Sequence, residues 1–161
     1  MKITTKGRYA VTAMVDIAIN ASDIPVSIAD IAQRHHISVS YLEQLLAKLR
    51  RQELVESSRG PGGGYVLGIK GLNITIAQII DAVDETVDAT ACHGSSNCNN
   101  GGPCLTHDLW SDLSDQVRYF LSGITIGQLV QKDAAKITIK NNSIPVVLHE
   151  ISKLNISVKQ I

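Results

Sequence analysis

The segment that most restricts the possible folds of this chain runs from Ser27 to Leu67. Residues 27–34 predict a short helix with Ser27 as its N-cap. After a tight connection at 35–38, residues 39–51 predict a second helix that ends in basic side chains. Two helices joined by a turn of a few residues form the helix-turn-helix pattern, which is typical of DNA-binding proteins.

A glycine-rich turn, Arg59-Gly-Pro-Gly-Gly-Gly64, follows directly and lies between strand-like runs at 54–58 and 65–67. A hairpin after a helix-turn-helix predicts a winged helix, and Arg59 is placed to reach a narrow groove or a phosphate. The glycine run could instead be a nucleotide-binding loop. It lacks the Gly-Lys-Ser/Thr ending of such loops and does not lead from a strand into a helix, so the hairpin is the prediction.

The other helices are predicted from apolar residues at helical spacing, which occur over residues 9–19, 75–85, 105–121 and 125–130. Thr75 and Gln78 have the spacing of a capping box. The stripe of residues 105–121 suits packing against a partner helix, or against its own domain. The expected fold class is mainly α with a small β-hairpin wing, as a winged helix-turn-helix plus a long dimerisation helix.

Charge is distributed unevenly, although the formal net charge is zero. Residues 1–70 carry nine Lys or Arg against six Asp or Glu, whereas residues 71–120 carry one against seven. A basic first part suits a polyanion-binding module, although a net charge of +3 (nine minus six) is also ordinary. The sequence has neither the roughly 20 apolar residues of a membrane span nor the apolar core of a signal peptide. We therefore expect a cytoplasmic protein that makes no membrane contact.

All three cysteines lie in one polar, glycine-rich stretch, at Cys92, Cys98 and Cys104, and His107 follows the last by a C-x-x-H step. Thiols stay reduced in the cytoplasm, so an odd number of clustered cysteines favours metal or redox chemistry over a disulfide. An enzyme with a nucleophilic cysteine is a third alternative, but the sequence near these cysteines shows no pattern for a pocket or an oxyanion hole.

Two metal centres suit these ligands. Zinc would accept three sulfurs and one nitrogen, but its structural sites usually use C-x-x-C pairs. The wider spacing fits two irons better, and a [2Fe–2S] cluster needs four protein ligands, which Cys92, Cys98, Cys104 and His107 supply. His93 is an alternative to His107 as the nitrogen ligand. It directly follows Cys92, however, and two adjacent residues are poorly placed to bind the same metal centre. One imidazole in place of a thiolate makes a cluster labile, which favours a sensor over a cluster carrier or electron-transfer protein.

Several runs make the chain resemble the IscR family of iron–sulfur cluster regulators over about residues 1–131. They are Thr5-Lys-Gly-Arg-Tyr-Ala-Val-Thr-Ala-Met14, Ile37-Ser-Val-Ser-Tyr-Leu-Glu-Gln-Leu45, Arg59-Gly-Pro-Gly-Gly-Gly-Tyr65, Ala82-Val-Asp-Glu85 and Cys104-Leu-Thr-His107. The resemblance implies a homodimer joined along a helix from about Cys104 to Ser122, with a [2Fe–2S] cluster on the four ligands named above. It also implies that the protein binds double-stranded DNA at pseudo-palindromic operators of two classes. The cluster-bound form would repress the operon for cluster assembly, and the apo form would still bind the second class. Cluster-assembly scaffold proteins would donate the cluster.

Carried over by position, the resemblance implies that Ser40, Glu43 and Gln44 face bases, that Ser38 and Tyr41 lie near the DNA backbone, and that Arg59 enters the minor groove. Glu43 could instead close a capping box with Ser40. As a DNA contact, its carboxylate can accept a hydrogen bond from cytosine N4 but repels sites that offer only acceptors.

On this basis the chain divides into four parts. They are a winged helix-turn-helix DNA-binding domain (1–85), a cluster-binding loop (86–104), the dimerisation helix with a short following helix (105–131), and a poorly ordered tail (132–161) with no assignable function.

Overall fold

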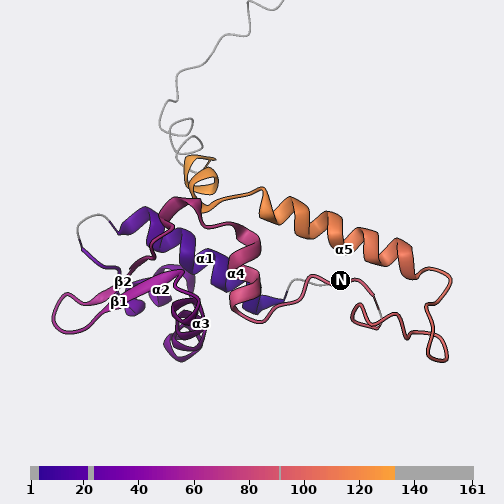
Figure 1. Cartoon of the computed structure of the whole chain (residues 1–161). Coiled ribbons are helices and arrows are strands. Elements are labelled where there is room, and N and C mark those ends of the chain that lie inside the picture. Colours follow the sequence, from indigo (N-terminus) through magenta and orange to yellow (C-terminus); the bar gives the residue numbers. More distant parts are fainter. Residues whose placement is uncertain (1–3, 22–23, 91, 133–161) are drawn as a thin grey trace, which may run out of the picture.

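A computed structural model of the chain describes residues 4–21, 24–90 and 92–132 (Figure 1). Its elements are α1 (Thr5–Asn20), α2 (Ile28–His35), α3 (Val39–Arg51), β1 (Val55–Ser58), β2 (Gly64–Leu67), a 3-10 turn (Gly71–Asn73), α4 (Ile76–Ala82) and α5 (His107–Ser122). Residues 126–132 are also helical. Figure 1 shows α1 to α4 and the hairpin gathered in one body, from which α5 extends to one side. Of the tail expected at 132–161, residue 132 is the end of this last helix, and residues 133–161 lie outside the described residues.

Helix starts follow the local capping residues that the sequence offers. The Ser27 hydroxyl accepts a hydrogen bond from the Asp30 backbone N–H (3.1 Å), and Thr75 with Gln78 forms the predicted capping box. The bounds predicted for α3, 39–51, are confirmed. The prediction that the long helix starts at Leu105 is wrong, since α5 begins at His107 and Leu105 lies in a turn, fully exposed.

The core lies where α3 packs against α1, α2 and α4. Fully or nearly fully buried side chains from these helices fill it, namely Met14, Ile17, Ile31, Leu42, Leu45, Leu46, Leu49, Ile79 and Ile80. The four leucines of α3 form the predicted inner stripe, so the opposite face of the helix is left at the surface.

A buried carboxylate fixes α2 against α1. Asp16 accepts hydrogen bonds from Arg34 Nε (2.8 Å) and Nη2 (2.6 Å), and His35 Nε2 lies 2.7 Å from the same carboxylate. Burial raises the pKa of Asp16, but the hydrogen bonds from Arg34 and His35 outweigh it, and the net pKa is lowered. The ionised carboxylate thus holds the first helix of the helix-turn-helix in place.

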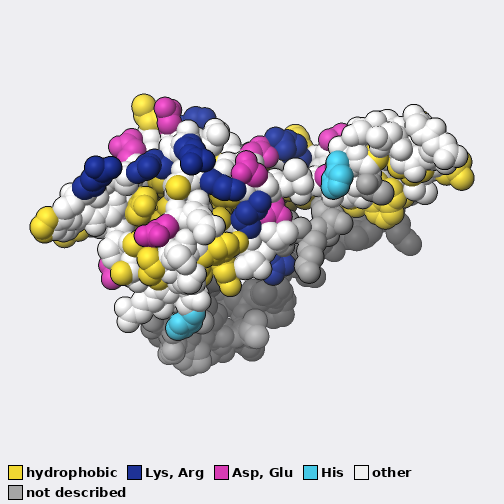
Figure 2. All heavy atoms as spheres, turned by 90° about the horizontal axis from the view of Figure 1, so that it is seen from below, with side chains coloured by type: hydrophobic (Ala, Val, Ile, Leu, Met, Phe, Trp, Pro, Cys, Tyr) yellow, Lys and Arg dark blue, Asp and Glu magenta, His cyan; other side chains and the backbone are white. Residues whose placement is uncertain are grey.

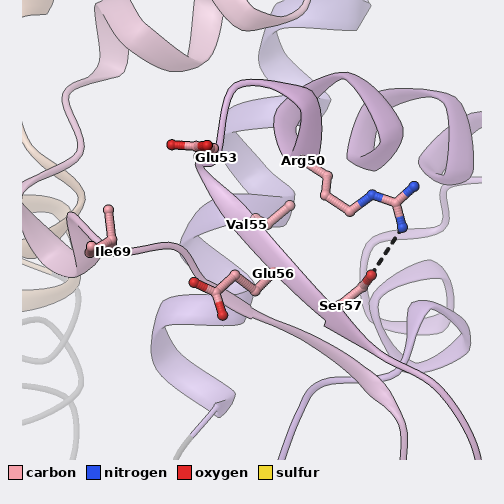
Figure 3. Close-up of a pocket in the computed structure, with 6 residues that line it drawn as sticks. All are labelled: Arg50, Glu53, Val55, Glu56, Ser57 and Ile69. Atoms are coloured by element: carbon pink, nitrogen blue, oxygen red, sulfur yellow. Dashed lines mark hydrogen bonds between the residues drawn. The ribbon is translucent and has the colours of Figure 1, made fainter.

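The wing is an antiparallel pair in which Val55 faces Leu67 and Ser58 faces Gly64. A Cβ atom at Gly64 would collide with the backbone of Val26, which pairs with Tyr65 in an isolated bridge. Arg50 Nη1, at the end of α3, donates to Ser57 Oγ of β1 (3.1 Å) across a shallow hollow (Figure 3). The wing is therefore anchored to both the end of α3 and the segment before α2.

Candidate metal centre and nucleic-acid interface

The exposed face of α3 carries the side chains expected to contact DNA. Ser40, Glu43 and Gln44 are exposed on it. Ser38 is the N-cap, because its hydroxyl accepts from the Tyr41 N–H (3.4 Å). The Tyr41 ring is half-buried in an edge contact with Tyr9.

This arrangement removes one alternative for Glu43. Since Ser38 caps α3, Ser40 is an ordinary helical residue, and the capping box considered between Ser40 and Glu43 is not formed. Glu43 also makes no salt bridge with any residue that the structure describes. Its carboxylate is free to face a ligand.

Basic side chains accompany this face. Figure 2, which views the molecule from the side at which α3 lies in Figure 1, shows Lys and Arg side chains along the body with acidic ones among them. Arg59 is exposed in the turn that joins β1 to β2, and Arg51 is exposed at the end of α3. Lys48 is held by Asp84, with Nζ 2.7 Å from a carboxylate oxygen. Cations at the end of α3 and in the wing suit contacts with phosphates.

The soft ligands converge in the loop between α4 and α5. The Nδ1 atom of His107 lies 3.5 Å from Cys92 Sγ and 3.7 Å from Cys98 Sγ. The ligand atoms of these three residues all lie within 4.8 Å of one another. His107 is the first residue of α5 and is only 8% exposed, so the helix start presents a nearly buried imidazole to two thiols.

The structure places the other two candidate ligands differently. Cys104 is not in this close group, but its backbone N–H donates to Cys98 Sγ (3.1 Å), which keeps it adjacent. His93 is exposed and lies outside the group, with a left-handed backbone (φ 51°). All three cysteines are free thiols and half-buried.

Local hydrogen bonds shift the pKa values of the three thiols in different directions, downward for Cys92 and Cys104 and upward for Cys98. Burial raises the pKa of Cys92, but hydrogen bonds with Thr90, Cys98 and the backbone lower it to about 6. A hydrogen bond with Cys98 lowers the pKa of Cys104. Thiolates are the form that binds metals, so part of the ligand set is ionised near neutral pH.

Residues just before the loop tie it to the DNA-binding body, and sequence reasoning assigned them no role. The buried carboxylate of Glu85 accepts hydrogen bonds from Thr4 N (3.1 Å) and Thr4 Oγ1 (2.6 Å). Asp84, with a left-handed backbone (φ 53°), accepts from Lys48 of α3, and its carbonyl accepts from Lys6 Nζ (2.6 Å). The two consecutive acidic residues after an apolar helix are the sequence signal that could have indicated this role. Their partners cannot be predicted from the sequence, because they are distant in it.

A helix-turn-helix with an exposed second helix, followed by a wing with an exposed arginine and by a loop of thiols, defines the class of DNA-binding regulators with a winged helix-turn-helix. The chain belongs to the Rrf2 family, described as iron-dependent transcriptional regulators, whose sequence pattern matches residues 3–132. It is therefore a transcriptional regulator and not an enzyme.

Named relatives agree with this membership. The chain is 58% identical over 130 residues to the HTH-type transcriptional regulator IscR of Aliivibrio salmonicida, covering 81% of this chain and 77% of that one. It is 56% identical over 130 residues to the IscR of an Escherichia coli strain, covering 81% and 80%. This similarity makes the chain an IscR-like regulator within the family.

Solved structures share the fold. The structure of CymR, the global cysteine regulator of B. subtilis, matches with a TM-score of 0.70 and 34% identity, covering 82% of this chain and 98% of that one. An IscR from T. potens matches with a TM-score of 0.67 and 33% identity, covering 85% and 90%. The winged-helix prediction is thereby confirmed. Among the described residues, no helix combines the length and apolar character needed to cross a membrane.

Proposed function

We propose that this regulator senses iron–sulfur cluster supply by holding a [2Fe–2S] cluster on Cys92, Cys98, Cys104 and His107. The observation that carries the proposal is the convergence of two cysteine sulfurs on His107 Nδ1 at the start of α5, with Cys104 beside them. Relatives named IscR, with more than half of their aligned residues identical, support it.

The donor set fits such a cluster in chemistry and in environment. Thiolate and imidazole are the ligands that iron–sulfur clusters use, and one imidazole in the set is associated with a raised reduction potential. When bound, the cluster would supply a redox-active and removable centre. The chain's own residues keep Cys92 ionised and donate a backbone hydrogen bond to the sulfur of Cys98. The lowered pKa of Cys92 favours its thiolate, the form that takes up a metal.

A contact path supports communication between this centre and DNA. The loop leaves the body directly after Asp84 and Glu85, which bind α3 through Lys48 and the start of α1 through Thr4. A change of the loop on cluster binding would therefore bear on the position of α3. We propose that occupancy in this way selects between two classes of operator, with Glu43 rejecting one class in the apo form.

The long helix supports a homodimer. Several large apolar side chains on α5 are exposed, namely Leu109, Trp110, Leu113, Tyr119 and Phe120. The opposite side of α5 faces its own body, where Arg118 binds Asp81 and Ser114 accepts from the Ala89 N–H. A second copy of α5 would cover the exposed side and set two recognition helices on a pseudo-palindrome, with half-sites about one or more helical turns apart.

The decisive experiment is anaerobic purification followed by an absorption spectrum and by iron, sulfide and zinc analysis. Equal amounts of iron and sulfide support the proposal, and zinc alone contradicts it. Footprinting of cluster-bound and apo protein near cluster-assembly genes tests whether the protein binds DNA there and whether the cluster changes this binding.

A cluster-bound protein that does not bind DNA but passes its cluster to acceptor proteins would favour the alternative function of a cluster carrier. Loading of the cluster by assembly scaffold proteins is tested with the same spectrum.

A further inference from the structure

Both ring nitrogens of His107 have a polar neighbour. Nδ1 faces the sulfurs of Cys92 and Cys98, at 3.5 and 3.7 Å. Nε2 lies 3.0 Å from the hydroxyl oxygen of Ser96, which is four residues after Cys92 in the same loop. The ring is therefore held by two contacts that point in opposite directions, and only one of them is to candidate ligands.

A neutral imidazole has one N–H and one bare nitrogen, and only the bare nitrogen can bind a metal. Two tautomers fit the free protein. In one, Nδ1–H donates to a cysteine sulfur and Nε2 accepts from Ser96. In the other, Nε2–H donates to Ser96 and the lone pair of Nδ1 faces the thiolates. Only the second leaves Nδ1 ready to bind.

We propose that Ser96 is a positioning residue whose hydroxyl accepts a hydrogen bond from Nε2–H of His107 when Nδ1 binds the metal, and so holds the ring with Nδ1 as the ligand atom. The inference rests on the proposed function, because it concerns the same metal centre. Metal-bound histidines usually donate their second N–H to another group, and loss of that group typically weakens metal binding by about 10- to 100-fold.

The loop is folded so as to bring Ser96 to the ring. The Ser95 N–H donates to the Cys92 carbonyl (3.0 Å), and the Gly94 N–H donates to Thr90 Oγ1 (2.8 Å). Ser96 itself has a left-handed backbone (φ 54°), which is unusual for a residue with a side chain. The turn that follows Cys92 thus places the hydroxyl on the far side of the imidazole.

The first test identifies the ligand atom. Reduced protein with 15N-labelled histidine is loaded with Zn²⁺, a diamagnetic probe that accepts the same thiolates and imidazole. A long-range ¹H–¹⁵N correlation spectrum should show His107 bound through Nδ1 with its proton on Nε2. Binding through Nε2, or zinc held without His107, overturns the inference.

The second test isolates the hydroxyl. Ser96→Ala and Ser96→Gly should each weaken zinc binding by about 10-fold in competition with a chromophoric chelator, and should speed loss of the iron–sulfur cluster to a chelator by a similar factor. Glycine also relaxes the left-handed backbone, so equal effects of the two variants assign the loss to the hydroxyl. Unchanged zinc affinity in both variants overturns the inference.

Two further variants control this result. The Ser95 side chain makes no hydrogen bond with the described part of the chain, so Ser95→Ala should bind zinc like the wild type. Ser96→Asn retains an acceptor in a residue that tolerates the left-handed region, and should recover most of the affinity. Equal losses in Ser95→Ala and Ser96→Ala would overturn the inference. Wild-type protein purified without iron and sulfide would reject the proposed function, while the zinc spectra would still decide the role of Ser96.

Discussion

The chemistry of the proposed sensor is carried by a few side chains that are absent from the core. The core side chains lie in α1 to α4, around the hairpin and just after α5, whereas Cys92, Cys98 and Cys104 lie in a loop without a core of its own. Since burial in the core stabilises the fold, these residues can change their bonding without unfolding the body. Predictions at this scale therefore separate ligand binding from folding.

Replacement of a ligand should empty the metal site and leave the fold. We expect Cys98→Ala to lose the iron–sulfur absorption and the bound iron, because it removes both a proposed ligand and the acceptor for the Cys104 N–H. The melting curve of the apo form should remain cooperative, and binding to the second class of DNA site should persist. An unfolded variant would show that the metal is structural and would contradict the sensing mechanism.

Glu43 should control which DNA sites the apo form accepts. Glu43→Ala removes an exposed carboxylate from α3, so apo protein should bind the cluster-dependent class about 10-fold more tightly, within the range of one base contact. Fluorescence anisotropy with both operator classes measures this. Gln44→Ala removes an uncharged neighbour that is itself expected to face bases, so it should not raise the affinity for this class. A general gain of Glu43→Ala on all DNA would contradict selective rejection.

At the level of elements, short polar contacts join pieces that the sequence separates. Glu85 meets Thr4 at a separation of 81 positions, and Asp84 meets Lys48 at 36. The Lys48 pair is exposed, and solvent screens such pairs so that they contribute little to stability. The pair is therefore better suited to orient α3 relative to the loop than to hold the fold together.

Removal of the Asp84 charge should uncouple the loop from α3. Asp84→Asn keeps a residue that tolerates the left-handed backbone and loses the ion pair with Lys48. The ratio of DNA affinities between cluster-bound and apo protein, expected between about 5 and 150 for a typical coupling, should fall toward one. Asp115→Asn, which removes the same charge from α5, should leave the ratio unchanged. A normal ratio in Asp84→Asn would rule out this contact as the path.

At the scale of the whole molecule, α5 contributes to both proposed functions. Its first residue is a proposed metal ligand, and its exposed apolar side is the proposed contact with a second copy of the chain. Its first residue is His107, and Leu109 (61% exposed) and Phe120 (64% exposed) lie on its outer side. Exposed apolar side chains in such a stripe are a mark of an interaction surface. The proposed dimer interface and one proposed metal ligand therefore lie on the same helix.

A charge in this stripe should break the dimer. We expect Leu109→Asp to weaken self-association at least about 10-fold, because an unpaired charge buried in an interface costs several kcal/mol. Sedimentation equilibrium measures the effect, and binding to a full palindrome should fall toward that of a half-site. Asp108→Ala, next to the stripe, is the control. A Leu109→Asp protein that remains a dimer would place the interface elsewhere.

The sequence alone determined what depends on local chemistry. Helical spacing predicted both ends of α3 to the exact residue, and capping residues predicted the Thr75–Gln78 capping box. Both features depend on neighbours only a few positions away. The glycine run between two strand-like segments predicted the wing, and the spacing of cysteines and histidine predicted the set of candidate ligands.

Only the tertiary structure decided which of those candidates meet, because their convergence depends on the path of a loop without a regular pattern. It brought the imidazole of His107 to Cys92 and Cys98, left His93 at the surface, and set Ser96 behind the ring. It also joined Asp84 to Lys48 across the fold. Such contacts form between residues far apart in sequence, and neither periodicity nor motif spacing contains them.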